Sequence, residues 1–231
     1  MKKYERLADA LTPDGTRLEL YRHDREYIIR ADGTELMSTR RHHSEERLAE
    51  LICEPLAAQT RPTVLIGGLG FGFTLRAALR LLPADARVIV AEIMAAVVDW
   101  NMRPDYPLAG TALRDPRVEL RHLDVAEVLH THAGVFDAVM LDVDNGADAL
   151  STAGNAQLYR DEGIRKTVAA LRPSGRLAYW SAAEDPRFEA SLRRAGLLVD
   201  ASRVQAHATT GRWHTIYVTR RARASIADAP A

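Results

Sequence analysis

From residue 64 onward, short apolar runs alternate with stretches in which apolar residues recur every three or four positions. The first pattern is typical of buried strands and the second of helices that cover them. The strand-like runs cover residues 64–66, 88–91, 118–120, 138–141, 177–180, 199–204 and 215–218, and the helix-like stretches cover 74–82, 94–100, 158–171 and 188–195. This alternation predicts an α/β fold with a mainly parallel, doubly wound, Rossmann-like sheet.

The first part of the chain follows a different pattern. Short β-leaning runs at 18–21, 27–29 and 34–37 alternate with charged residues, and a turn dipeptide stands at Asp32-Gly33. We expect a small N-terminal β-hairpin or meander over residues 1–43, too small to fold alone, which packs on the main domain or lids it.

The main domain is expected over residues 44–220 and a flexible tail over 221–231. It should open with a helix that Ser44 caps and that stops near Pro55, and the helix at 158–171 should end at Pro173-Ser174-Gly175.

Composition narrows the class of protein. The 231 residues include 31 Lys and Arg and 31 Asp and Glu, so the formal net charge is zero, which argues against a nucleic-acid-binding protein. No apolar run is long enough to cross a membrane, and the first residues lack the apolar segment of a signal peptide. With Cys53 as the single cysteine, an intrachain disulfide or a zinc-finger site is excluded, and we expect a cytoplasmic enzyme without a metal.

A glycine cluster separates the first predicted strand of the main domain from its first helix. In VLIGGLGFGFTLR, Gly68, Gly70 and Gly72 form the pattern G-x-G-x-G. Glycine there allows a tight turn and close approach of a ligand. The dinucleotide fingerprint G-x-G-x-x-G would need a glycine at Phe73, which disfavours an NAD-dependent oxidoreductase, and no Walker A lysine follows.

Acidic residues follow the next two predicted strands at the same edge of the sheet. Glu92 ends the second strand, where an acid can accept the two hydroxyls of a ribose. Asp124 follows the third strand, where it or the backbone of Val125 can contact an adenine edge. Each acid alone is better explained as a helix cap or a solvated charge, but together with the glycines the acids favour a nucleoside site.

At this point the sequence resembles the spermidine synthase-like family of the class I S-adenosylmethionine-dependent methyltransferase fold. The similarity runs from about residue 35 to 198 and rests on IGGLGFGFTLR, VIVAEI, DPRVELRHLDVAEVL, FDAVMLDVDNG, LYRDEGI and LRPSG. The resemblance implies that the three glycines line the donor, that Glu92 holds its ribose, that Asp124 lies by its adenine and that Asp142 is the catalytic acid–base residue. It also suggests a homodimer.

The sequence departs from this family where the amines would bind. The aspartate usual in the glycine loop is replaced by Phe71, and the second acid after the fourth strand, Asp144, comes one residue early. Leu48 stands where the family has a tyrosine and Thr39 where it has a glutamine, although Glu50 fits the accompanying glutamate.

The predicted chemistry is displacement at a sulfonium, which requires positioning rather than a metal. Asp142 would orient an amine and take its proton. Asp144 and Asn145 would attract and bind the substrate, unless they only form a turn, and Trp180 would stack on the substrate, unless it belongs to the core. The loop over residues 207–214 is a candidate cover for the site.

The departure at Phe71 suggests the donor. Losing a carboxylate along the donor's tail should favour intact S-adenosylmethionine, because the intact donor carries a carboxylate of its own. Arg40 or Arg41 could bind that carboxylate, unless these arginines are merely solvated. We therefore favour transfer of a methyl or other alkyl group to a small-molecule amine. The alternatives are a polyamine aminopropyltransferase that uses decarboxylated S-adenosylmethionine, and a non-catalytic domain that binds a nucleoside or a partner.

Overall fold

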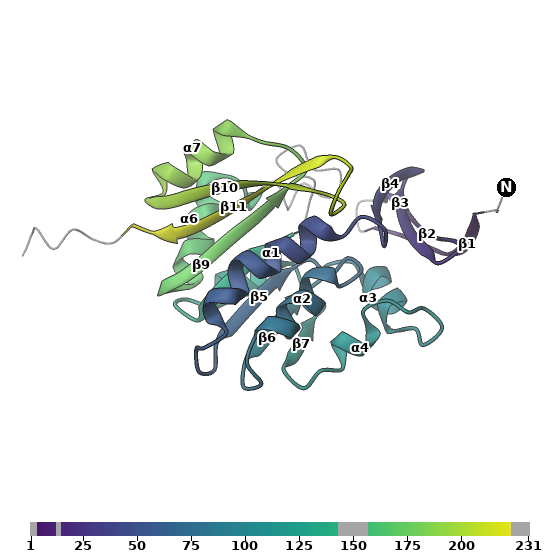
Figure 1. Ribbon diagram of the computed structural model, residues 1–231, viewed down its shortest axis with the longest axis horizontal. Coiled ribbons are helices and arrows are strands. Elements are labelled where there is room, and N and C mark those ends of the chain that lie inside the picture. Colours follow the sequence, from purple (N-terminus) through teal and green to yellow (C-terminus); the bar gives the residue numbers. More distant parts are fainter. Residues whose placement is uncertain (1–3, 13–14, 143–156, 223–231) are drawn as a thin grey trace, which may run out of the picture.

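A computed structural model describes residues 4–12, 15–142 and 157–222 of the chain (Figure 1). A seven-stranded sheet has the strand order β10-β11-β9-β8-β5-β6-β7. β5 (Thr63–Gly67), β6 (Arg87–Ala91), β7 (Val118–Arg121), β8 (Phe136–Leu141) and β9 (Leu171–Ser181) are parallel to one another, whereas β11 (Trp213–Arg221) and β10 (Leu197–Gln205) add an antiparallel hairpin. The predicted fold class is confirmed.

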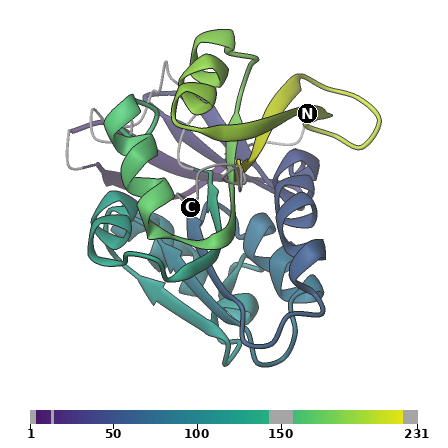
Figure 2. The ribbon, with the colours of Figure 1, turned by 90° about the vertical axis from the view of Figure 1, so that its left-hand side faces the viewer.

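Helices cover both faces of this sheet. Both faces of the sheet are apolar. In β5, for example, Val64 and Ile66 pack in one hydrophobic cluster, whereas Leu65 packs in another. Figure 2 shows α1 on one side of the sheet and α6 and α7 on the other. The helices are α1 (His43–Cys53), the short 3-10 helix η1 (Glu54–Leu56), α2 (Phe73–Leu81), α3 (Ala95–Met102), α4 (Gly110–Leu113), α5 (Val125–Thr131), α6 (Asp161–Ala170) and α7 (Pro186–Arg194). None of the helices within the described residues is long and apolar enough to cross a membrane.

The N-terminal region forms a four-stranded antiparallel sheet in the order β1-β2-β3-β4. Its strands are β1 (Glu5–Leu11), β2 (Arg17–His23), β3 (Glu26–Ala31) and β4 (Thr34–Ser38). The patterning predicted the last three strands but missed β1. Leu20 and Ile29 of this sheet pack in the same hydrophobic cluster as Leu48 of α1 and Leu75 of α2, so the two sheets share one core.

Two predicted helix boundaries are wrong. Ser44 does not cap α1: the helix begins at His43 after His42, and Ser44 is buried in the first turn. Helix α6 ends at Ala170, before the Pro-Ser-Gly segment, because β9 begins at Leu171. The pairing of β9 with β8 is interrupted after Phe136 and resumes at Ala138, opposite Arg176, so the segment forms an irregularity within the strand.

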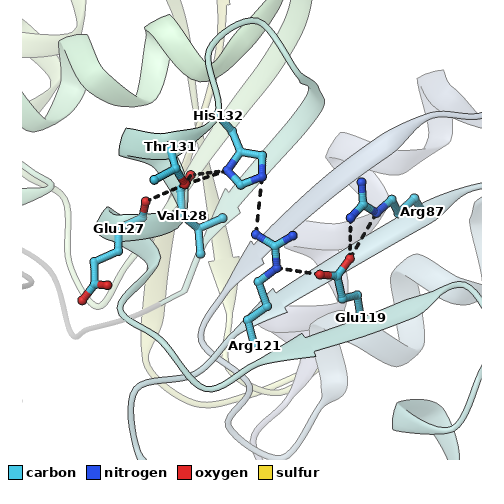
Figure 3. A network of polar contacts seen from close by, with 7 residues as sticks. All are labelled: Arg87, Glu119, Arg121, Glu127, Val128, Thr131 and His132. Atoms are coloured by element: carbon cyan, nitrogen blue, oxygen red, sulfur yellow. Dashed lines mark hydrogen bonds and ion pairs between the residues drawn. The ribbon is translucent and has the colours of Figure 1, made fainter.

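A polar network covers the edge strand β7 (Figure 3). Arg87 and Arg121 both donate to Glu119, at 2.5 and 2.7 Å, and these bonds lower the pKa of Glu119. Arg121 also lies 3.4 Å from Nε2 of His132, at the end of α5. Charged side chains on an edge strand discourage pairing with another chain, and we assign this network that structural role.

Candidate active site

A cavity of about 420 Å³ lies at the carboxyl ends of the parallel strands, between the two sheets. This edge of a doubly wound sheet is where ligands bind. Residues that follow five parallel strands form its floor: Gly68 and Gly70 after β5, Glu92 and Met94 after β6, Asp124 and Val125 after β7, Asp142 after β8, and Trp180 and Ala182 at the end of β9. Apolar residues of the N-terminal sheet form its roof, among them Leu18, Ile29 and Met37.

The three predicted loop glycines have different roles. Gly68 and Gly70 line the cavity with φ angles of +91° and +50°, which favour glycine. Gly72 (φ +74°) is not among the residues that line it. A Cβ at Gly72 would lie 2.4 Å from Cβ of Ala109. The glycine at this position is explained by packing at the start of α2, and a contact between Gly72 and the donor stays a prediction.

Glu92 links the second strand to the glycine loop. Its carboxylate accepts hydrogen bonds from the backbone N–H groups of Leu69 at 2.9 Å and Met94 at 2.8 Å. Burial raises the pKa of Glu92, and these backbone hydrogen bonds oppose that shift. The side chain lines the cavity, so it shapes the loop at the place where we predicted a ribose contact.

Asp124 both caps a helix and lines the cavity, the two roles that its sequence position allowed. It caps α5 by accepting a hydrogen bond from the N–H of Ala126 at 2.8 Å, and it also lines the cavity beside the buried Val125. Trp180 likewise lines the cavity while packing against His214, with ring centroids 4.6 Å apart.

Asp142 lies at the inner end of the cavity. Its backbone N–H donates to the carbonyl of Gly67 at 2.9 Å, and its carboxylate accepts from the hydroxyl of Thr74 at 3.2 Å. Burial raises the pKa of Asp142 to about 6, and the Thr74 bond opposes this shift. A carboxyl group with such a pKa exchanges protons near neutral pH, as a general base does.

The sequence analysis missed a second carboxyl group here, that of Glu45 in the first turn of α1. Glu45 is half-buried, and burial raises the pKa of its carboxyl group well above the usual value. The negative charge of Asp142 raises this pKa further, and the positive charge of Arg76 opposes the shift. The only signal in the sequence was an acid at the start of a helix, which is common because of the helix dipole.

Phe71 does not lie along the cavity. Its side chain is 1% exposed and packs in the hydrophobic core, and it is not among the residues that line the cavity. The expectation that it borders the donor's tail is wrong, because the left-handed turn at Gly70 and Gly72 carries the intervening side chain into the core.

The other residues considered for the amine and carboxylate groups are dispersed. Asp144 and Asn145 lie outside the described residues. Arg41 lines the cavity and forms an ion pair with Glu35, whereas Arg40 is exposed and does not line it.

The remaining three positions at which the sequence was compared with the family do not line the cavity. Leu48 is buried in the core, the hydroxyl of Thr39 accepts a hydrogen bond from the N–H of Tyr27 at 2.9 Å, and Glu50 forms an ion pair with Arg47. None of the three positions is among the described residues that line the cavity.

The loop between β10 and β11 borders the cavity, as we expected of a cover. Ala206, Arg212 and His214 line it, and the carbonyl of Ala206 accepts a hydrogen bond from the N–H of His43 at 3.1 Å. Burial lowers the pKa of His214, so this side chain is neutral at pH 7.

Known proteins with similar sequences are aminopropyltransferases. A curated polyamine aminopropyltransferase from Leptospira biflexa serovar Patoc is 29% identical over 148 residues, which cover 64% of this chain and 50% of the relative. One from Thermoanaerobacter sp. (strain X514) is 39% identical over 89 residues, which cover 38% of this chain and 31% of the relative. The matched region thus spans half or less of these relatives' length. No protein-family model matches the chain.

Solved structures of spermidine synthases share the fold. The enzyme from Thermotoga maritima superposes with a TM-score of 0.66 at 18% identity, covering 93% of this chain and 72% of that one. A spermidine synthase in complex with the transition-state analogue AdoDATO superposes with a TM-score of 0.67 at 17% identity, with the same coverage of 93% and 72%. The chain therefore shares its fold with these spermidine synthase structures, and 64% of its length aligns with a polyamine aminopropyltransferase.

Proposed function

We propose that the protein is an aminopropyltransferase that moves the aminopropyl group of decarboxylated S-adenosylmethionine to a small-molecule amine. The observation that carries this proposal is Asp142, a surrounded carboxyl group with a pKa near 6, beside the glycine loop in a cavity whose rim also holds Glu92 and Asp124. The sequence similarity to polyamine aminopropyltransferases favours aminopropyl transfer over the methyl transfer that the sequence alone favoured.

The chain's residues would assist a displacement at carbon. The lone pair of the acceptor nitrogen forms a bond to the methylene carbon next to the sulfonium, the carbon–sulfur bond breaks, and its electron pair stays on the sulfur as a neutral thioether. Gly68, Gly70, Glu92 and Asp124 would hold the nucleoside, and Asp142 would take the proton that the nitrogen loses. An alkylammonium has a pKa of about 10, so freeing its lone pair at pH 7 costs roughly 4 kcal/mol, which is why a nearby base matters.

The charges around the cavity support a donor without a carboxylate. Asp142 and Glu45 would repel the carboxylate of intact S-adenosylmethionine and attract an ammonium group. Arg41, the cation we considered for that carboxylate, is already neutralised by Glu35.

Calorimetric titration of the purified protein with the two donors tests this proposal. We expect tighter binding of decarboxylated than of intact S-adenosylmethionine, and formation of 5′-methylthioadenosine when a diamine is added. Tighter binding of the intact donor with methylation of an amine would restore methyl transfer. Binding without turnover of any amine, or no binding of either donor, would favour the non-catalytic domain.

A further inference from the structure

The glycine loop of this chain offers no carboxylate, but α1 brings one to the same place. A Cβ built on Gly70 would lie 3.8 Å from Oε1 of Glu45 and 3.4 Å from Sδ of Met37. The carboxyl group of Glu45 therefore borders the turn of the glycine loop on the side that faces the cavity. The side chain of Phe71 does not lie on that side, because it is buried in the core.

Tertiary contacts hold Glu45 in this position. The hydroxyl of Thr74, which donates to the carboxylate of Asp142 at 3.2 Å, also lies 3.4 Å from the backbone carbonyl oxygen of Glu45. α1 is anchored against α2 by buried side chains such as Leu48 and Leu75. One threonine thus links the first turn of α1 to the end of β8.

The carboxylate of Glu45 differs from that of its neighbour Glu46. The carboxylate of Glu46 lies 3.2 Å from Nδ1 of His42 and forms an ion pair with Arg80 at 3.8 Å. Across the described residues, no side chain or backbone group forms a hydrogen bond or ion pair with the carboxylate of Glu45.

The nearest positive charge, Arg76, has other contacts. Its guanidinium donates to the carbonyl of Phe71 at 3.0 Å and lies over the ring of Phe73 at 4.4 Å. The carboxylate of Glu45, which has no paired cation and lies near the negative charge of Asp142, can bind an ammonium ion, because the ion relieves their repulsion.

We infer that Glu45 is the residue that binds the ammonium group at the end of the donor's aminopropyl chain, and so selects the decarboxylated donor. This inference rests on the proposed function. Glu45 borders the glycine loop, where the donor's tail would lie, whereas Asp142 remains free to meet the acceptor nitrogen. The carboxylate that would bind the donor's ammonium group thus comes from α1 and not from the glycine loop.

The charged groups that act on Glu45 are Asp142 at the end of β8, Arg76 on α2 and Glu46 on its own helix. A bound ammonium ion favours the ionised forms of both Glu45 and Asp142. Donor affinity should therefore rise with pH over the range in which the two carboxyl groups lose their protons.

The test compares Glu45→Gln with the wild type and with Glu46→Gln as matched control. The two titrants are decarboxylated S-adenosylmethionine and 5′-methylthioadenosine, which carries the same nucleoside but has a neutral thioether sulfur and no ammonium group. For Glu45→Gln we expect the Kd of the donor to increase about 10- to 100-fold and its pH dependence to flatten, while the Kd of methylthioadenosine changes less than about threefold. Glu46→Gln should leave both dissociation constants within about twofold.

Each outcome decides between the inference and the proposed function. Unchanged donor affinity in Glu45→Gln, or equal losses for both titrants, would overturn the inference and leave the proposed function intact. If the wild type itself prefers intact S-adenosylmethionine or binds neither donor, the proposed function fails and the inference fails with it. Circular dichroism of the variant, whose glutamine has nearly the same shape, shows whether the fold is kept.

Discussion

At the scale of single residues, Asp142 illustrates how a functional group can weaken the fold that carries it. Its carboxyl group is forced into a site that disfavours the charged form, so its pKa rises from 3.8 to about 6. Between these two values the folded chain binds more protons than the unfolded chain. The free energy of unfolding therefore falls as pH rises through this range, and the loss is complete above about pH 6.

We predict that Asp142→Asn makes the protein more stable at pH 8, by about 1–3 kcal/mol, because it removes the charge that burial penalises. The gain should disappear near pH 4, where the aspartate of the folded wild type is protonated. Thermal unfolding of both proteins at the two pH values measures this. A variant that is less stable than the wild type at pH 8 would contradict the pKa assigned to Asp142.

The same substitution should lower kcat/KM by about 10²–10⁴-fold, the usual contribution of a general base. The Kd of the donor should stay within a few-fold, since the substitution leaves Glu45 and the predicted nucleoside contacts in place. In the wild type, the rate should fall as pH decreases below about 6, where Asp142 takes up a proton. Undiminished turnover in Asp142→Asn would show that another group accepts the proton.

At the scale of elements, the turn from β5 into α2 separates two reasons for a glycine. Gly70 borders the cavity, whereas Gly72 is needed because Ala109 leaves no room for a side chain. Both have positive φ angles, so the sequence pattern alone could not distinguish them.

We predict that Gly72→Ala destabilises the protein by about 2–4 kcal/mol, from backbone strain and the clash with Ala109 together. The matched control is Gly33→Ala, in a turn of the N-terminal sheet with φ +80° and no atom within 4 Å of the added Cβ. It should cost only about 1 kcal/mol from the backbone. Denaturant unfolding of both variants provides the comparison, and equal losses would show that Ala109 adapts without cost.

At the scale of the whole molecule, the N-terminal sheet is part of the main domain's core and not an appendage. Leu18, Leu20 and Ile29 pack in one cluster with residues of α1, α2 and β5, and residues of this sheet also line the cavity. The two sheets should therefore unfold together.

The three tryptophans, at positions 100, 180 and 213, all belong to the main domain, so their fluorescence follows the unfolding of that domain. We predict that Leu20→Ala, at a fully buried position of β2, lowers the stability seen by this fluorescence by about 2–4 kcal/mol in urea. Leu11→Ala, at a site 71% exposed on β1, is the control and should change it by less than about 0.5 kcal/mol. An unchanged transition in Leu20→Ala would mean that the N-terminal sheet unfolds on its own.

Much of the fold and part of the site could be predicted because their signals are local. Buried strands read as apolar runs, and Glu92, Asp124 and Asp142 were found because the carboxyl ends of parallel strands must meet at one edge. The strand β1 escaped prediction because its residues are mostly charged or half-buried and give no clear alternation.

The sequence by itself determined the alternation of strands and helices, the glycine turn and the row of acids at the sheet edge, since each depends on spacing along the chain. Only the tertiary structure decided which side chains reach the cavity. It placed Phe71 in the core, gave Gly72 a packing role, brought Glu45 beside Asp142 across 97 positions of sequence and laid the N-terminal sheet over the site. These arrangements depend on how helices pack on sheets, and helix packing joins residues whose separation in the sequence carries no periodic signal.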